Sequence, residues 1–349
     1  MQVRPGCAVP EPPQNLSAPS PIRHRTLSAQ QYLDGILRGD RTILAQAITL
    51  IESSRGADRQ LAERIVEDCL PHSGNSLRVG ITGVPGAGKS SLIEVLGTHL
   101  ICEHGQKVAV LAIDPSSQIS GGSILGDKTR MSSLASSDMA FIRPSPSRGS
   151  LGGVAQRTRE AMLLCEAAGF DVIIVETVGV GQSETAVAGM SDVFVLLQLP
   201  NAGDELQAIK KGIVELADIV VVNKADIDPA AAERACGHMR SALSLLRPSS
   251  KSWQPPVLAV SAARNQGIDG FWRLIENYRN TMQASGEFEA KRRRQAQAWM
   301  WALIESGLSS RFRSHPAVRA ALPELSSAVE AGMITPAAAA NQLLAYLKE

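Results

Sequence analysis

One eight-residue segment constrains this chain more than any other, because residues 83 to 90 read GVPGAGKS. An apolar run over residues 77–81 precedes it, and apolar residues at helical spacing follow it, which predicts a strand, a glycine-rich turn and a helix. Its three glycines let backbone N–H groups point at phosphate oxygens beside the helix N-terminus. Lys89 would neutralise the β and γ phosphates, and Ser90 would give its hydroxyl to Mg²⁺. The segment predicts a nucleoside triphosphate site.

A second motif predicts which base the site selects. The apolar run 219–222 ends in Asn223, Lys224, Ala225 and Asp226. Guanine presents two adjacent donors that the Asp226 carboxylate can accept, whereas adenine would set a lone pair against it. Asn223 would donate to the base, and the stem of Lys224 would cover one ring face. After a further apolar run, Ser261, Ala262 and Ala263 lie where a backbone N–H could meet guanine O6. The expected ligands are GTP and GDP.

Acidic residues between the two motifs are candidates for catalysis and metal binding. A buried-type strand delivers Glu176 to the active edge, where phosphoryl transfer needs anionic groups around Mg²⁺. Asp114 and Asp127 are further candidates for the metal or its water shell, although Asp127 is also compatible with a helix cap or a solvated loop. Either Gln182 or Glu176 could orient the attacking water.

The segment 200–212, PNAGDELQAIKKG, also leaves the end of a predicted strand, where ligands of parallel sheets bind. Asp204 and Lys210 are therefore candidates to respond to the γ phosphate, and Lys210 is included among the catalytic candidates. The alternative is that Asp204 caps the following helix and Lys210 is solvated.

The order of the apolar runs predicts an α/β fold. Predicted strands alternate with helical segments, which favours a doubly wound, mostly parallel sheet covered on both faces. The six predicted strands lie near residues 77–82, 107–113, 172–176, 193–199, 219–223 and 256–260. Three amphipathic helices precede the first strand and are expected to pack on the nucleotide domain as a helical cap.

Four regions are expected along the chain. They are a disordered tail over 1–26, a helical region over 27–75, the nucleotide domain over 76–280 and a helical arm over 281–349. The arm has too few apolar positions for a core of its own, so it is expected to pack on a second subunit. Its basic cluster Lys291–Arg294 is interpreted as a solvated helix face.

Composition narrows the possible partners and compartment. The chain has 349 residues with 35 basic and 34 acidic side chains, a net charge of +1 that gives no broad footprint for nucleic acid. Its sequence has no apolar run of about 18 residues, so no membrane span is expected. Five cysteines are scattered singly, which indicates free thiols in a reducing compartment. A bacterial cytoplasm is the expected location.

Several longer blocks carry a family resemblance. The blocks GITGVPGAGKSS, IDPSS, GGSILGDKTRM, FIRPSPS, ETVGVGQSE, GDELQAIKKG and VNKAD resemble the methylmalonyl-CoA mutase-associated GTPases of the MeaB/ArgK family. The match runs from about Leu27 to the C-terminus. It implies a homodimeric GTPase that helps load adenosylcobalamin onto an acyl-CoA mutase, ejects damaged cofactor and protects the enzyme during turnover.

The resemblance also implies site residues. Nucleotide contacts would fall on Gly83, Val84, Pro85, Gly86, Ala87, Gly88, Lys89, Ser90, Ser91, Asp226 and Ser261–Ala263, with mobile switch segments near Asp114–Arg130, Glu176–Glu184 and Leu199–Lys210. Ser91 and Asn201 depart mildly from the residues usual in the family. We expect slow intrinsic hydrolysis that a partner accelerates, with Arg130, Arg143 or Arg148 as candidates to approach the phosphates.

Three other functions share such a nucleotide site. A metallochaperone GTPase would carry metal through His-rich tracts or paired cysteines, whereas the six histidines here are dispersed. A kinase would need an acceptor pocket and a base, for which the sequence offers no motif. A nonhydrolysing scaffold would change shape with GTP without turnover.

Overall fold

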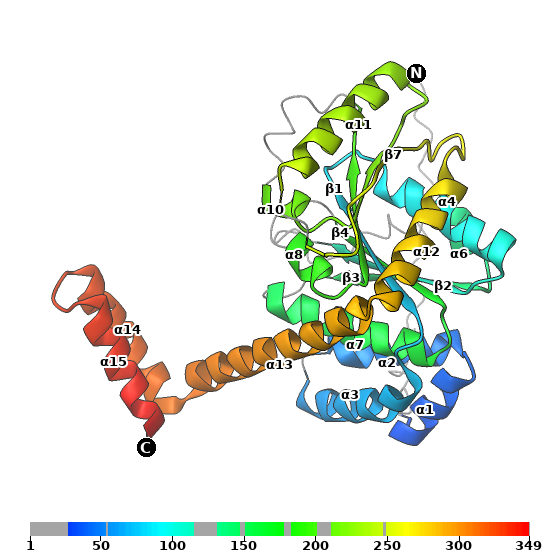
Figure 1. Cartoon of the computed structure of the whole chain (residues 1–349). Helices are drawn as coiled ribbons and strands as arrows, with labels where there is room; N and C mark the ends of the chain where they lie inside the picture. The colour runs from blue at the N-terminus through cyan, green and yellow to red at the C-terminus, as the bar shows by residue number, and fades with distance from the viewer. Residues whose placement is uncertain are drawn as a thin grey trace, which may run out of the picture.

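A single parallel sheet forms the centre of the protein (Figure 1). The computed structural model describes residues 27–53, 55–114, 131–146, 151–177, 183–200, 211–246 and 249–348. Within them, seven strands form the sheet in the order β3-β2-β4-β1-β5-β6-β7, and all six neighbouring pairs are parallel. The strands are β1 (Leu77–Gly83), β2 (Val108–Asp114), β3 (Ala140–Pro146), β4 (Val172–Thr177), β5 (Val193–Gln198), β6 (Ile219–Val222) and β7 (Val257–Ala259).

The sheet grows in both directions from β1, with β4 on one side and β5 on the other. In open parallel sheets, ligands bind outside the carboxyl ends of the strands where the order changes direction. The doubly wound α/β fold is therefore confirmed, and it places the end of β1, with the glycine-rich segment, at the expected ligand site.

The sequence did not predict β3, the edge strand that pairs with β2 alone. It contains Pro144 and Pro146, and proline removes a ladder donor. Proline is tolerated at a sheet edge, where one side of the strand needs no partner. This position explains how a proline-containing segment joins the sheet.

Helices cover both faces of the sheet. On one face lie α4 (Lys89–His104), α6 (Ser132–Ala135) and α12 (Ile268–Ala284), which share a buried apolar cluster with β1. On the other face lie α7 (Leu151–Ala167), α8 (Ser183–Ala188), α10 (Lys211–Val214) and α11 (Pro229–Ser244). Long apolar strands buried on both faces follow from this double cover.

The three predicted N-terminal helices form and pack as expected. They are α1 (Ala29–Leu37), α2 (Arg41–Glu52) and α3 (Gly56–Cys69), followed by a 3-10 turn, η1 (Leu70–His72). Their buried residues, including Ile36, Ile48 and Ile65, join one cluster with α7 and the sheet. The region therefore acts as a helical cap over α7.

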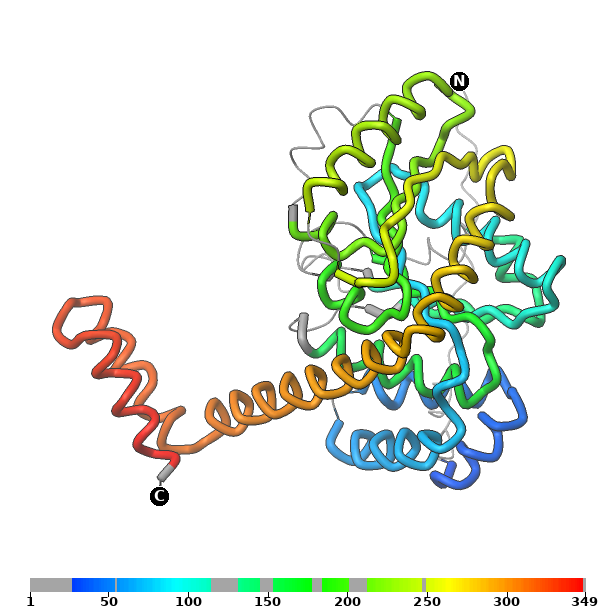
Figure 2. The backbone as a smooth tube through the Cα atoms, viewed as in Figure 1, coloured from blue at the N-terminus to red at the C-terminus, as the bar shows by residue number. Residues whose placement is uncertain are grey.

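A long helix projects from the body of the molecule (Figure 2). Helix α13 (Glu287–Ser314) leaves the end of α12 and leads to α14 (Pro316–Glu330), α15 (Pro336–Ala345) and the final turn η2 (Tyr346–Lys348). Its outer part exposes large apolar side chains, among them Trp301 at 59% and Leu308 at 60%. None of the helices in the described ranges is long and apolar enough to cross a membrane.

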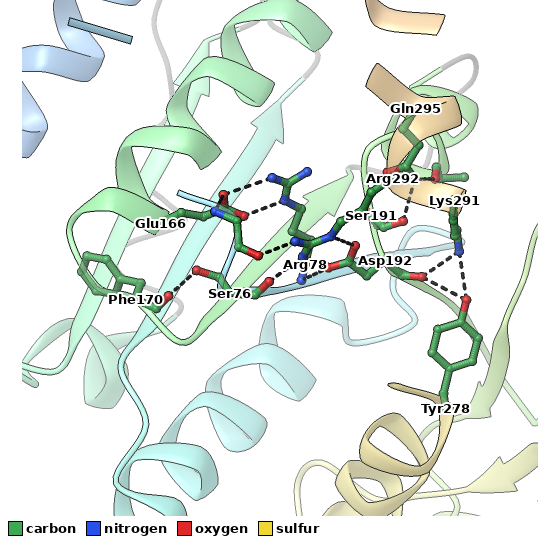
Figure 3. Close-up of polar contacts among 12 residues, drawn as sticks. Ser76, Arg78, Glu166, Phe170, Ser191, Asp192, Tyr278, Lys291, Arg292 and Gln295 are labelled. Carbon is green, nitrogen blue, oxygen red and sulfur yellow. Dashed lines mark hydrogen bonds and ion pairs between the residues drawn. The ribbon is translucent and has the colours of Figure 1, made fainter. Parts of the chain in front are cut away.

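The root of α13 corrects one sequence prediction, because half of the cluster Lys291–Arg294 is engaged with the body (Figure 3). Arg292 binds both carboxylate oxygens of Asp192 at 2.6 and 2.7 Å, and Lys291 Nζ lies 2.9 Å from Asp218 Oδ2. Arg293 and Arg294 are exposed, as predicted. The partner acids precede β5 and β6, far away in sequence, so helical spacing gave no sign of them.

Candidate nucleotide-binding site

The phosphate loop begins at Gly83, where β1 ends, and runs to Ser90 in the first turn of α4. Gly83 and Gly88 have φ values of 153° and 86°, which favour glycine. A Cβ on Gly83 would run into the carbonyl oxygen of Leu197 on β5. A Cβ on Gly88 would lie 2.6 Å from Asn223 Nδ2. Both glycines are therefore required by close approach as well as by backbone conformation.

Lys89 folds back over the phosphate loop. Its Nζ donates to the carbonyl oxygens of Gly83 at 2.8 Å and Val84 at 3.1 Å, and the residue is only 8% exposed. Burial lowers the pKa of the Lys89 ammonium, and the negative charges of Glu176 and Glu184 oppose this shift. A buried cation inside a loop of backbone amides suits the binding of phosphate.

Ser90 and Glu176 meet at the same edge. The Ser90 hydroxyl donates to Glu176 Oε1 at 2.9 Å, and Glu176 is buried at the end of β4. Next to it, Thr177 and Thr82 join β4 to β1 through a 2.8 Å hydrogen bond between their hydroxyls. Hydroxyl and carboxylate oxygens are the ligands that Mg²⁺ prefers, so this pair fits the metal of a nucleotide complex.

The structure does not describe the side chains of the other predicted acids and catalytic candidates. Asp114 ends β2, two strands from β1, and its side chain lies outside what the structure describes. Asp127, Gln182 and Lys210 lie outside the described residues. Within those residues, no three His, Cys, Asp or Glu side chains gather to hold a metal by themselves. Mg²⁺ usually takes only one or two carboxylates and completes its shell with phosphate and water.

Asn223 connects three loops, a role that the sequence did not reveal. Its Nδ2 donates to the carbonyl of Ala87 at 2.9 Å, and its Oδ1 accepts from the N–H of Ala262 at 3.1 Å. Both ends of the amide thus bind protein, whereas the motif predicted donation to the base. The side chain joins the phosphate loop to the two loops expected around guanine.

The residues expected around the base also lie close together at this edge of the sheet. Asp226 Oδ1 accepts a 2.6 Å hydrogen bond from the Ser261 hydroxyl, which holds the carboxylate in place. Lys224 adopts a left-handed conformation with φ of 61°, and its Cε lies 3.8 Å from the position of a Cβ on Gly88. The stem of Lys224 therefore lies beside the phosphate loop. Ala263 follows Ala262 and is exposed.

Sequence reasoning missed three polar residues near this edge. Arg264 Nε lies 3.9 Å from Asp226 Oδ2. Glu184 in α8 is 3% exposed, and its Oε2 has no hydrogen-bond partner within the described part of the chain. The Gln198 amide at the end of β5 is likewise buried and unpaired there. The sequence could have indicated these three residues by their positions, because each is a polar residue at or after the end of a buried strand or at the start of the next helix.

One predicted arginine is placed away from the phosphate loop. Arg143 lies on the edge strand β3, where it pairs with Glu52 and donates to the Thr49 hydroxyl at 3.2 Å, both on α2. It therefore fixes the helical cap to the sheet. The expectation that Arg143 approaches the phosphates is not supported, while Arg130 and Arg148 lie outside the described residues.

The fold and the site together define a P-loop GTPase. The carboxyl ends of β1, β4, β6 and β7 lie at one sheet edge and bring together a glycine-rich phosphate loop, a hydroxyl–carboxylate pair suited to a metal and an aspartate suited to guanine. The chain belongs to the family whose model is described as methylmalonyl-CoA mutase-associated GTPase MeaB, which matches residues 44–317. Several relatives are named GTPases, and GTP hydrolysis is the activity of this chain.

Individual relatives agree with this assignment. The GTPase ArgK of Escherichia coli is 52% identical over 264 residues, 75% of this chain and 80% of that protein. A mouse protein named methylmalonic aciduria type A homolog, mitochondrial, is 46% identical over 334 residues, 91% of this chain and 80% of its own length. A crystal structure of an LAO/AO transport system kinase has a TM-score of 0.74 at 38% identity, covering 92% of this chain and 98% of that one.

Proposed function

We propose that this GTPase is a chaperone for an adenosylcobalamin-dependent acyl-CoA mutase of the methylmalonyl-CoA mutase type. Its nucleotide state would gate cofactor loading, protection of the mutase during turnover and its reactivation. The carrying observation is the family match over residues 44–317, because the family is described by its association with methylmalonyl-CoA mutase. The mouse relative, named for methylmalonic aciduria, supports the same partner class.

In this proposal the nucleotide contacts divide by chemistry. Residues 83–91 hold the phosphates, Asp226 accepts the donors of guanine, and Lys224 and Ser261–Ala263 border the base. The Asn223 amide holds these loops together, as its bonds to Ala87 and Ala262 suggest. Ser90 and Glu176 would hold Mg²⁺, with Asp114 and Asp127 as further candidates. The bound metal would neutralise negative charge on the β and γ phosphates.

Hydrolysis would be a direct attack by water. The water oxygen bonds to the γ phosphorus, the bond from γ phosphorus to the bridging oxygen breaks, and GDP, phosphate and a proton are the products. Glu176 or Gln182 would orient the water, Lys89 would offset the charge on the leaving phosphates, and Lys210 would respond to the γ phosphate. The burial of Glu176 and Lys89 beside one another favours this arrangement.

The projecting arm supports a homodimer. Met300, Trp301, Ile304 and Leu308 lie at helical spacings on α13 and are exposed. Large apolar side chains gathered on one helix are typical of an interface. We place the protein in the bacterial cytoplasm, where thiols stay reduced. Free cysteines, including Cys69 whose pKa burial raises to about 11, suit that compartment.

The partner can be tested with purified components. The protein is mixed with an adenosylcobalamin-dependent acyl-CoA mutase from its own cell, and complex formation is followed by surface plasmon resonance with GDP and with a nonhydrolysable GTP analogue. Nucleotide-dependent binding, and uptake of cofactor by the apo-mutase that changes with nucleotide, are the expected results. Absence of a complex in both states, while GTP is still hydrolysed, would remove the mutase partner and leave the GTPase.

A kinase is a second candidate, because the solved structure at 38% identity is described as a transport system kinase. The two activities differ in the fate of the γ phosphate. Incubation with γ-labelled GTP and candidate acceptors should release free phosphate in proportion to GDP. Labelled acceptor formed in place of free phosphate would favour the kinase.

A further inference from the structure

The turn Gly189–Asp192 connects two elements that both reach the nucleotide edge. It follows α8, whose first turn holds the buried Glu184, and it precedes β5, which ends at Gln198. The negative charge of Glu184 acts on Lys89, so the far end of α8 lies near the phosphate loop. Gln198 accepts the N–H of Asn223 through its backbone carbonyl at 3.0 Å. A shift at either end would therefore reach this turn.

The turn is also packed tightly on β1, the strand that enters the phosphate loop. A Cβ on Gly80 would collide with the Ser191 hydroxyl and would lie 2.8 Å from Val187 Cγ1. Asp192 and Arg78 exchange two hydrogen bonds at 2.8 Å, one from the Asp192 N–H and one to its carboxylate. Close-packed contacts of this kind transmit displacement because they leave no free space.

The root of the arm binds the same turn (Figure 3). Gln295 Nε2 on α13 donates to the Ser191 carbonyl at 2.9 Å and contacts the Ala188 carbonyl at 3.4 Å. One turn earlier, Arg292 binds the carboxylate of Asp192, which is 1% exposed. The turn Gly189–Asp192 is thus contacted by β1, α8 and β5 on the nucleotide side and by α13 on the side of the arm.

A second contact strengthens this junction from the side of α7. Arg159 donates to the Gly189 carbonyl at 2.8 Å, and its guanidinium lies 5.6 Å from the ring centroid of Trp299 on α13. The arginine therefore contacts the turn and the arm at once. Through Arg159, α13 also packs indirectly against the end of α8, in addition to the hydrogen bonds from Gln295 and Arg292.

We propose that this junction, formed by the turn Gly189–Asp192 with Arg292, Gln295 and Trp299, couples the nucleotide state to the orientation of the arm. GTP and GDP differ in the γ phosphate, and the contact of Ser90 with Glu176 lies where that phosphate and its metal would act. Glu184 in the first turn of α8 acts on the neighbouring Lys89. If two arm orientations exist, linkage requires that each favour one nucleotide. The inference needs nucleotide binding alone and does not depend on the mutase partner.

Gln295 is the informative position for a test. Arg292 and Lys291 belong to a buried ionic network whose loss endangers folding. Gln295 makes neutral hydrogen bonds, so Gln295→Ala should preserve the fold while removing the bonds from α13 to the Ala188 and Ser191 carbonyls. Gln297 lies two residues further on the same helix and is exposed, so Gln297→Ala is a matched control.

Hydrogen exchange measured by mass spectrometry follows both ends of the junction in the full-length protein. In the wild type and in Gln297→Ala, peptides covering 186–192 and 289–305 should exchange differently with GDP and with a nonhydrolysable GTP analogue. In Gln295→Ala the difference should remain at 186–192 and become smaller at 289–305, because Arg292 and Trp299 keep their own contacts at the junction. By linkage, the ratio of affinities for the two nucleotides should change by about fivefold or more in this variant.

Two results would overturn the coupling. One is exchange over 289–305 that is the same in both nucleotides in the wild type, and the other is a difference over 289–305 that is undiminished in Gln295→Ala. Calorimetry on the same samples establishes nucleotide binding. Failure to bind either nucleotide would reject the GTPase site itself along with the coupling, whereas failure to bind a mutase would leave the coupling intact.

Discussion

The Ser90 hydroxyl donates a 2.9 Å hydrogen bond to Glu176 Oε1 and thereby joins the first turn of α4 to the end of β4. These residues are far apart in the sequence, and the parallel pairing of β1 with β4 brings them together. A hydroxyl and a carboxylate in this position match the requirement for Mg²⁺ next to a triphosphate. In the proposed mechanism, this pair links phosphate binding to hydrolysis.

Replacing Glu176 with glutamine should separate binding from turnover. The amide keeps the shape of the side chain but removes its charge and its ability to orient water, so hydrolysis should fall by about 100-fold or more. Affinity for GTP should change much less, and the Mg²⁺ concentration needed for half-maximal rate should rise. Steady-state phosphate release across a magnesium titration measures both effects.

The exposed Glu103 on α4 supplies the control, and Glu103→Gln should behave as the wild type. Unchanged turnover in Glu176→Gln would reject both the catalytic and the metal roles of this carboxylate.

Changing Asp226 to asparagine should alter the base that is bound. The carboxylate accepts both donors of guanine, whereas the amide prefers xanthine, which carries a carbonyl in place of the exocyclic amine. GTP affinity should fall by about 100-fold, and XTP affinity should rise above that of GTP. Competition with a fluorescent nucleotide gives the two constants.

Asp228→Asn tests the specificity of that result. Asp228 caps α11 by accepting from the N–H of Ala231, and asparagine is an equally good cap, so this variant should keep its preference for GTP. If Asp226→Asn kept the same preference, Asp226 would not contact the base.

Replacing Gly88 with alanine should destabilise the protein and weaken nucleotide binding. In Gly88→Ala, the methyl group would lie 2.6 Å from Asn223 Nδ2 at a backbone φ of 86°, so the link from Asn223 to Ala87 should break. Thermal unfolding should show a loss of about 1–3 kcal/mol, and nucleotide affinity should fall with it.

Gly237 lies inside α11 with open space around it, so Gly237→Ala should raise stability by up to about 1 kcal/mol. Equal stability of the Gly88→Ala variant and the wild type would contradict the close packing described for the loop.

The order of elements and the type of site followed from the sequence because both depend on local patterns. Apolar runs ending in a glycine-rich turn or in Asn223–Asp226 place those motifs at one sheet edge for any parallel sheet. The edge strand β3 escaped notice because Pro144 and Pro146 oppose strand formation everywhere except at an edge.

Long-range polar contacts were not predictable in the same way. The sequence gives no sign that Asn223 binds Ala87, or that Arg292 finds Asp192, since each pair meets only after the strands have assembled. The interpretation of Lys291 and Arg292 as solvated was wrong for that reason. The spacing of apolar residues and the composition of a helix predict which of its faces is buried. The residues that the helix contacts depend on the whole fold.

The ionic root of the arm predicts a large effect on stability. In Arg292→Met the Asp192 carboxylate would stay buried without its bidentate partner, which should cost about 3–5 kcal/mol in the free energy of unfolding. Urea unfolding followed by circular dichroism measures the loss.

Arg294→Met removes a charge two residues further along the same helix at an exposed position, so its effect should stay within about 0.5 kcal/mol. Similar small effects in both variants would show that the ion pair does not anchor α13.

The central claim is that the loop Gly83–Ser90 binds GTP for hydrolysis with selection for guanine. Phosphate release measured in parallel for GTP and ATP, in the wild type and in Lys89→Ala, tests it most directly. The account predicts turnover of GTP, at least about 100-fold lower turnover of ATP, and loss of GTP turnover in the variant. Equal or faster release from ATP, or full GTP turnover in Lys89→Ala, would contradict it.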